Sequence, residues 1–133
     1  SHKNCKGIFK GIANSCLLES RRQDGLNTVM SGEDLCNVGP VAVIQDLAVM
    51  AILGIQSVER NGHHYMAGLS QFPKRTQNQI LSAHPELYTK SERSWPALTI
   101  INGQIDVSTI NQNPMGTGFE LDLNEYEEIP IRE

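Results

Sequence analysis

Three clusters of titratable side chains each follow a segment with strand-like sequence. Carboxylates, imidazoles and amines are the groups that give and take protons in enzymes. In a barrel of parallel strands, all strand C-termini open on one face, and that face holds the active site. The clusters therefore predict an acid–base site built from several strand ends. Their members are His2 and Lys3 in the first cluster, Glu33 and Asp34 in the second, and Glu59, His63 and His64 in the third.

Each cluster also has a structural interpretation. His2 and Lys3 are compatible with simple solvation, and Glu33 and Asp34 with electrostatic stabilisation of the next helix N-terminus. Glu59 is followed by a cationic residue, which is compatible with an ion pair.

Adjacent residues on a strand point to opposite faces, so His63 and His64 cannot both face one site. We expect at most one of them, preferably His63, to do so.

Glu59 is the candidate that the pattern favours most. If Val58 packs outward against helices, the alternation of a strand turns Glu59 into the barrel. A carboxyl group there would be partly desolvated, which raises its pKa and favours the neutral acid. A neutral acid can donate a hydrogen bond to an oxygen that gains negative charge in the transition state.

The elements that must position these residues alternate between helix and strand. Such alternation predicts parallel strands covered by helices, because a parallel connection needs a crossover. A change of pattern follows, where Asn102-Gly103 predicts a hairpin turn. The expected helices are 6–22, 41–53 and 73–84; the expected strands are 28–30 and 55–60, with hairpin strands 97–101 and 104–107; 114–118 is a loop and 120–133 an acidic, peripheral tail.

The helix expected at 41–53 is apolar nearly all round, with Gln45 and Asp46 as its main polar positions. Such a helix is buried on most sides. A parallel sheet must also be covered on both faces, and two strands do not make a closed one. The sequence therefore predicts that further strands precede this segment.

Composition excludes some classes of function. The 133-residue chain has a net charge of −4 and its Lys and Arg residues do not cluster, which argues against a nucleic-acid surface. The longest apolar stretch, residues 38–55, is interrupted by polar residues and does not predict a membrane span. Three cysteines without a Cys-x-x-Cys pair favour reduced thiols in a cytoplasmic protein.

Several segments of the chain match the pattern of a known family. They are SHKNCKG at 1–7, SGEDL at 31–35, VGP at 38–40, LGI at 53–55 and SVERNGHHY at 57–65. Through these segments, most of the chain resembles the enolase superfamily, in its mandelate racemase branch. The first segment is similar to the end of the sixth barrel strand, and the next ones look like the seventh and eighth β/α units. The hairpin at Asn102-Gly103 and the loop 114–118 are similar to the C-terminal extension that returns to the capping domain.

The resemblance implies an α/β fold class. The chain would be the C-terminal portion of a (β/α)₈ barrel, from the end of strand six through helix eight, with a C-terminal β-hairpin extension. Residues 1–92 would form the partial barrel and 93–133 the hairpin and tail, which pack near the capping domain. The N-terminal capping domain and strands one to five would be absent.

The resemblance also implies a reaction, the abstraction of a proton next to a carboxylate while Mg²⁺ stabilises the enediolate. The parent protein would be a lyase, such as a sugar-acid dehydratase, or an isomerase, and the isolated chain is expected to be inactive. The Mg²⁺ ligands are expected upstream, with none in this segment. Expected partners are a small carboxylate substrate, the rest of the barrel with its capping domain, and further copies in a homo-oligomer. The rival hypothesis is a non-catalytic barrel protein that binds or assembles.

The implied site has catalytic and substrate-binding members. The branch carries a histidine paired with a sixth-strand aspartate, and this chain lacks that pair, which argues against racemisation by two opposed bases. The catalytic candidates are Glu59, Lys3, His2 and Glu33, and the candidates for substrate binding are Asp34, His63 and His64.

Overall fold

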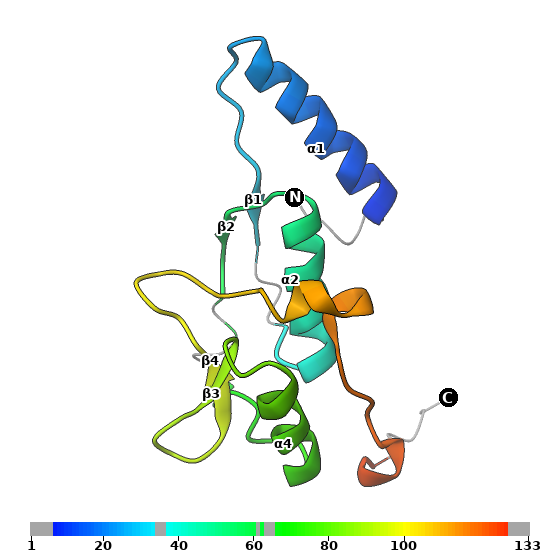
Figure 1. The fold of residues 1–133 in the computed structure, drawn as a ribbon, viewed down its shortest axis with the longest axis vertical. Coiled ribbons are helices and arrows are strands. Elements are labelled where there is room, and N and C mark those ends of the chain that lie inside the picture. The colour runs from blue at the N-terminus through cyan, green and yellow to red at the C-terminus, as the bar shows by residue number, and fades with distance from the viewer. Residues whose placement is uncertain (1–6, 34–36, 61, 63–65, 128–133) are drawn as a thin grey trace, which may run out of the picture.

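The computed structural model describes residues 7–33, 37–60, 62 and 66–127. In this part of the chain, helices flank two small sheets, and one helix projects away from the rest (Figure 1). The elements are α1 (Ile8–Gln23), β1 (Ser31–Gly32), α2 (Pro40–Ile52), β2 (Ser57–Val58), α4 (Lys74–Ala83), β3 (Tyr88–Lys90), β4 (Pro96–Leu98) and the 3₁₀ turns η1 (Ile110–Gln112), η2 (Pro114–Gly116) and η3 (Leu123–Glu125).

The helix predicted at 6–22 is confirmed as α1, and a turn at Gly25 follows it. Gly25 has a φ of 82°, and its N–H donates to the carbonyl of Arg22. The N–H of Leu26 donates to the carbonyl of Arg21 at 2.9 Å. These two bonds satisfy carbonyl groups that the last turn of a helix leaves without partners.

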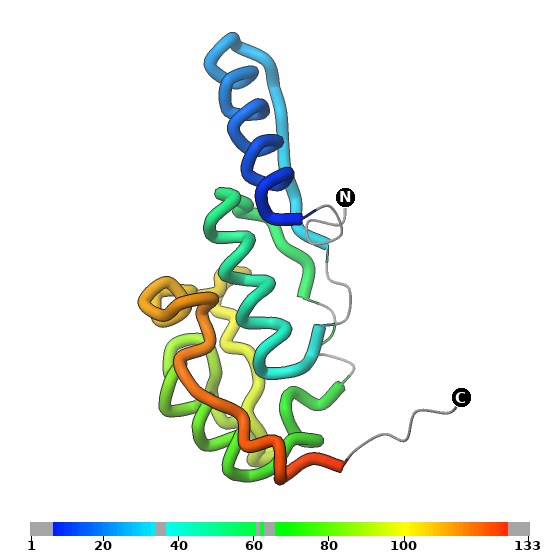
Figure 2. Tube along the Cα trace, turned by 90° about the vertical axis from the view of Figure 1, so that its right-hand side faces the viewer, coloured from blue at the N-terminus to red at the C-terminus, as the bar shows by residue number. Residues whose placement is uncertain are grey.

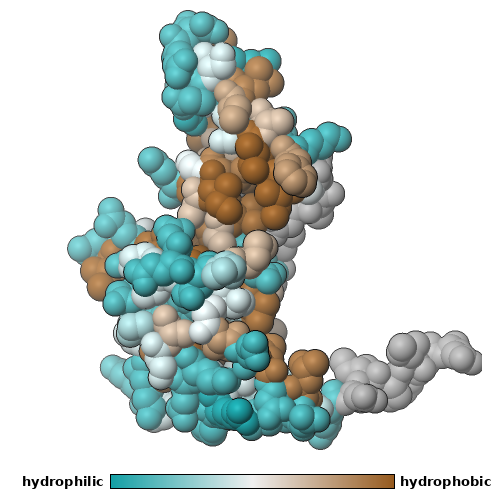
Figure 3. All heavy atoms as spheres, turned by 45° about the vertical axis from the view of Figure 1, so that its right-hand side comes forward, coloured by the Kyte–Doolittle hydropathy of each residue, from teal (hydrophilic) through white to brown (hydrophobic). Residues whose placement is uncertain are grey.

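The apolar face of α1 contacts α2 only near its start. Ile8 packs against the end of α2, and a Cβ on Gly11 would lie 3.3 Å from Leu53. Ser15 Oγ donates to the Leu53 carbonyl at 2.8 Å. Beyond these contacts the face is open: Phe9 is 89% exposed and Leu17 50%. Apolar surface gathers across this upper part of the molecule, whereas the lower part is mostly polar (Figure 3).

The helix predicted at 41–53 is confirmed as α2, and it is buried as expected. Pro40 occupies the first turn, where its missing N–H costs nothing. Gly54, with a φ of 66°, ends the helix. The two core clusters both draw on α2, which therefore organises the fold. No described helix is long and apolar enough to cross a membrane.

The parallel arrangement predicted for the first two strands is confirmed. Ser31 pairs with Ser57 and Gly32 with Val58, and α2 is the crossover between the strands. The expected position of the first strand is wrong, because residues 28–30 lie outside the ladder. Thr28 is instead tied to α1: its Oγ1 donates to Leu18 O, and its carbonyl accepts from Arg22 Nε, both at 3.1 Å.

The hairpin turn predicted at Asn102-Gly103 forms, but its flanking strands pair differently. Asn102 and Gly103 have φ values of 51° and 76°, and Ile101 bridges Gln104. The ladder stops there, since Ile105 and Val107 pack against the core. The strand before the turn, β4, pairs antiparallel with β3 instead.

Gly68 sits where the backbone approaches this second sheet. Its φ is 56°, a left-handed conformation, and an added Cβ would collide with the Pro96 carbonyl oxygen. That oxygen accepts the Leu69 N–H at 2.9 Å, so the loop cannot move away freely.

We expect Gly68→Ala to lower the free energy of unfolding by about 2 kcal/mol, because backbone strain and overpacking add. Urea denaturation measures the loss. Gly103→Ala is the matched control, since its φ is also positive but its Cβ would meet open space. If both variants lowered the free energy of unfolding equally, the contact with Pro96 would make no measurable contribution to the destabilisation.

A buried histidine fastens the C-terminal part of the chain to the end of α4. His84 Nε2 lies 2.7 Å from the Thr117 carbonyl oxygen, and Nδ1 lies 3.1 Å from Thr109 Oγ1. Because a carbonyl oxygen only accepts, Nε2 carries a proton and donates it. Phe119 packs edge-on against the same ring. Figure 2 shows the chain from η1 to η3 running beside α2 and then beside α4.

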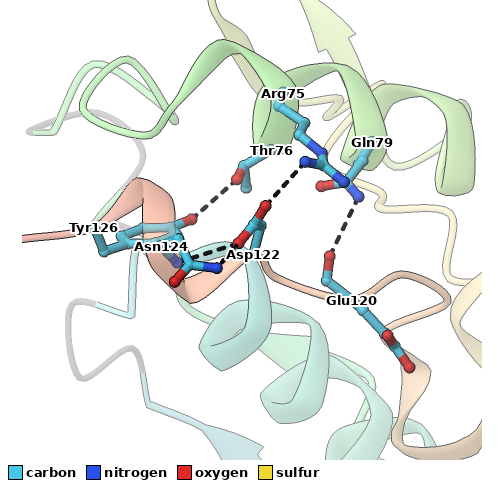
Figure 4. Close-up of polar contacts among 7 residues, drawn as sticks. All are labelled: Arg75, Thr76, Gln79, Glu120, Asp122, Asn124 and Tyr126. Atoms are coloured by element: carbon cyan, nitrogen blue, oxygen red, sulfur yellow. Dashed lines mark hydrogen bonds and ion pairs between the residues drawn. The ribbon is translucent and has the colours of Figure 1, made fainter.

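The following segment, residues 119–127, crosses α4 and is called the tail strap here (Figure 4). Arg75 Nη1 lies 2.9 Å from Asp122 Oδ2, and the hydroxyl groups of Thr76 and Tyr126 are 3.0 Å apart. Gln79 donates to the strap backbone at 3.2 Å. The acidic tail expected at 120–133 is thus peripheral but bonded to α4 in its described part.

The attachment of the tail strap should weaken in acid. Hydrogen bonds from the Asn124 backbone and side chain, together with Arg75, hold the pKa of Asp122 below its usual 3.8. A lowered pKa stabilises the folded state above the unfolded pKa, and this contribution disappears as the pH falls through the folded value. We expect the NMR signals of Tyr126 to shift toward unfolded values below about pH 4.

Asp122→Asn should remove this acid-dependent step. Asp106→Asn is the matched control, because hydrogen bonds from Ser108 also lower the pKa of Asp106, away from the strap. If the Tyr126 signals of Asp122→Asn still shifted in acid as in the parent protein, protonation of Asp122 would not be the cause of the weakened attachment.

Candidate active site

The two faces of the β1–β2 pair differ in character. One face meets α2: a Cβ on Gly32 would collide with Met50, and Val58 packs against the cluster that contains Met50. Because side chains alternate along a strand, the residues on either side of these two occupy the opposite face. That face carries Ser31, Glu33, Ser57 and Glu59.

The polar face bears a shallow hollow of about 480 Å³, which both carboxylates line. Glu33 and Glu59 each follow their strand directly, and the Glu59 N–H donates to the Gly32 carbonyl at 2.9 Å. The structure therefore brings these two predicted residues together at the carboxyl edge of a parallel strand pair. Such an edge is where α/β proteins place their ligands.

Val58 packs toward the helix, as the prediction for Glu59 required. The expected desolvation of Glu59 is not found, however, because its side chain is exposed in the described structure. Only two strands are paired here, so no further strand covers the polar face within the described residues.

A buried ion pair lies behind this edge. Arg60 Nη2 is 3.0 Å from Asp46 Oδ2, and the two side chains are only 5% and 1% exposed. Arg60 Nη1 also donates to the Glu59 carbonyl at 2.7 Å. The carboxylate that meets Arg60 in this pair comes from the middle of α2, rather than from Glu59 as the alternative interpretation had it.

Two further features surround Arg60. Its Nε is buried and has no hydrogen-bond partner among the described residues. Burial raises the pKa of the Tyr88 hydroxyl, and the nearby Arg60 charge partly opposes that rise. Tyr88 therefore stays protonated near neutral pH.

Sequence reasoning missed the Asp46–Arg60 pair, although a signal was present. Asp46 is the only charged residue of α2, whose other residues are apolar except for Gln45. A charge that is buried in this way requires a partner.

A larger hollow, of about 880 Å³, lies between α2, β2 and the segment 100–107. Its polar lining residues include Ser57, Glu59, Arg60 and Gln104. Glu59 thus borders both hollows.

Five predicted site residues cannot be placed, because they lie outside the described residues: His2, Lys3, Asp34, His63 and His64. Within the described ranges, no group of three or more His, Cys, Asp or Glu residues could hold a metal ion.

Comparisons of the chain with protein-family models, with curated protein sequences and with solved structures gave no match.

Proposed function

We propose that this chain supplies the last β/α units of a barrel enzyme that moves a proton next to a carboxylate, as a lyase such as a sugar-acid dehydratase or as an isomerase. The observation that carries the proposal is the meeting of Glu33 and Glu59 at the carboxyl edge of β1 and β2, opposite the crossover helix. A β-α-β unit with a polar face of this kind is the repeating element of such barrels.

The roles of Glu59 and Glu33 are assigned from their places just after β2 and β1, and those of the other residues from the resemblance. Glu59 donates a hydrogen bond to the substrate oxygen that gains negative charge, and Glu33 exchanges a proton with a leaving or migrating hydroxyl group. The base that takes the α-proton is assigned to Lys3 or His2. Asp34 and one of His63 and His64 contact the substrate.

The open surfaces support the further strands that this proposal requires. Glu59 is exposed, so burial within the described residues does not supply the dry surroundings that favour a neutral acid. Additional strands and the bound substrate would supply them. The open apolar face of α1 is likewise suited to another β/α unit.

The proposal keeps the Mg²⁺ ligands in residues upstream of this segment, as the resemblance implies. None of the roles above depends on the ion.

Deuterium exchange tests the proposal. The encoded polypeptide that contains these residues is incubated in D₂O with Mg²⁺ and a panel of hydroxylated carboxylic acids, including sugar acids. We expect deuterium at the α-carbon of one substrate class, or loss of water to give a 2-keto acid, both visible by NMR. A folded protein that exchanges none of the panel would favour the non-catalytic barrel protein instead.

A further inference from the structure

We infer that the Asp46–Arg60 pair positions Glu59, with Arg60 as the positioning residue. The inference rests on the proposed function, because it gives the pair a role in presenting a residue of that same site. Arg60 does not reach the polar face itself: it is buried, whereas the Glu59 side chain is exposed.

Both backbone hydrogen-bonding groups of Glu59, its N–H and its carbonyl, have partners. Its N–H donates to Gly32 O at 2.9 Å, which fixes it to β1. Its carbonyl accepts from Arg60 Nη1 at 2.7 Å, a short charge-assisted bond. With both backbone groups fixed, the direction in which the Glu59 side chain leaves the strand is defined.

Arg60 can hold this carbonyl because α2 holds Arg60. Asp46 Oδ2 accepts from Nη2 at 3.0 Å, and Met50 Sδ lies 3.5 Å from the same nitrogen, one turn further along the helix. The planar guanidinium thus uses separate nitrogens for α2 and for the strand end. A lysine, with a single nitrogen, cannot reproduce this fork.

A purely stabilising role makes a different prediction. Buried ion pairs can often be replaced by apolar residues of similar volume without loss of stability. An apolar pair keeps the packing but cannot donate to the Glu59 carbonyl. Asp46→Leu/Arg60→Met therefore separates stability from positioning, and Arg60→Lys keeps the charge opposite Asp46 but loses the fork.

Two measurements on the encoded polypeptide distinguish a positioning role of Arg60 from a purely stabilising one. The first is hydrogen exchange of the Glu59 amide, relative to the His84 amide, which bonds Ile80 O in the core. We expect this ratio to rise about 10-fold in the double variant, as for loss of one charge-assisted hydrogen bond. The second is turnover, where we expect kcat to fall about 10-fold with KM little changed, as when an interaction specific to the transition state is lost.

Arg60→Lys should show the same two changes, and it provides the test if the double variant does not fold. An exchange ratio and a kcat equal to those of the parent protein, in a folded variant, would overturn the inference and leave the pair a structural contact. A parent protein without activity would remove the proposed reaction alone. In that case, the exchange ratio still decides whether Arg60 fixes the Glu59 backbone.

Discussion

Asp46→Ala is expected to lower the free energy of unfolding by about 3–5 kcal/mol, the cost of leaving a buried charge without its partner. Arg60 is almost fully buried, and its pairing with Asp46 crosses from α2 to the end of β2. The variant would strand the guanidinium in the core and leave a cavity beside it. Chemical denaturation, followed by far-UV circular dichroism, measures the loss.

Glu92→Ala is the matched control, because Glu92 is an exposed carboxylate in the turn between β3 and β4. It should change stability by well under 1 kcal/mol, as exposed charges do. If Asp46→Ala lowered the free energy of unfolding as little as Glu92→Ala, Arg60 would have reached solvent or another partner in the variant. The buried ion pair would then contribute little to stability.

Glu59→Ala is expected to reduce turnover by roughly 10²-fold or more in the encoded polypeptide, by analogy with loss of a single oxyanion donor. Glu59→Gln keeps a donor and the shape, so it should lose less. Both variants should fold, because the Glu59 side chain is exposed and takes no part in the core clusters. Steady-state kinetics and thermal unfolding, measured on the same preparations, test the two statements together.

Glu86→Ala removes an exposed carboxylate that lines neither hollow, and it should leave turnover unchanged. If Glu59→Ala were as active as the parent protein while remaining folded, Glu59 would have no place in the site. The polar edge of β1 and β2 would then need another explanation.

The helices were the part of the fold that the sequence predicted best. Apolar spacing, Pro40 and the glycines that follow α1 and α2 are local signals, and local hydrogen bonds decide where helices begin and end. The strands were harder, since pairing depends on distant residues. The predicted turn at Asn102-Gly103 forms, but β4 pairs with β3 and not with the residues after the turn. Those later residues pack into the core instead.

Only part of the candidate site could be predicted from the sequence. The convergence of Glu33 and Glu59 was predictable from the rule that parallel strands end at one edge. The burial of each residue was not, because it depends on what covers the polar face. The sequence also placed Arg60 beside Glu59, but the partner from α2 emerges only when the crossover packs against the strands.

Helix α1 is joined to α2 through Ile8, Gly11 and Ser15, near its first two turns, and none of its residues is buried. Segments with so few buried contacts open at much lower free energy than the core that carries them. The described chain is therefore not expected to unfold as a single cooperative unit. The part of the chain from α2 onward should melt as one unit, while α1 unfolds earlier. Trypsin-like proteases should then cleave after Arg21 and Arg22 in a molecule whose core is still intact.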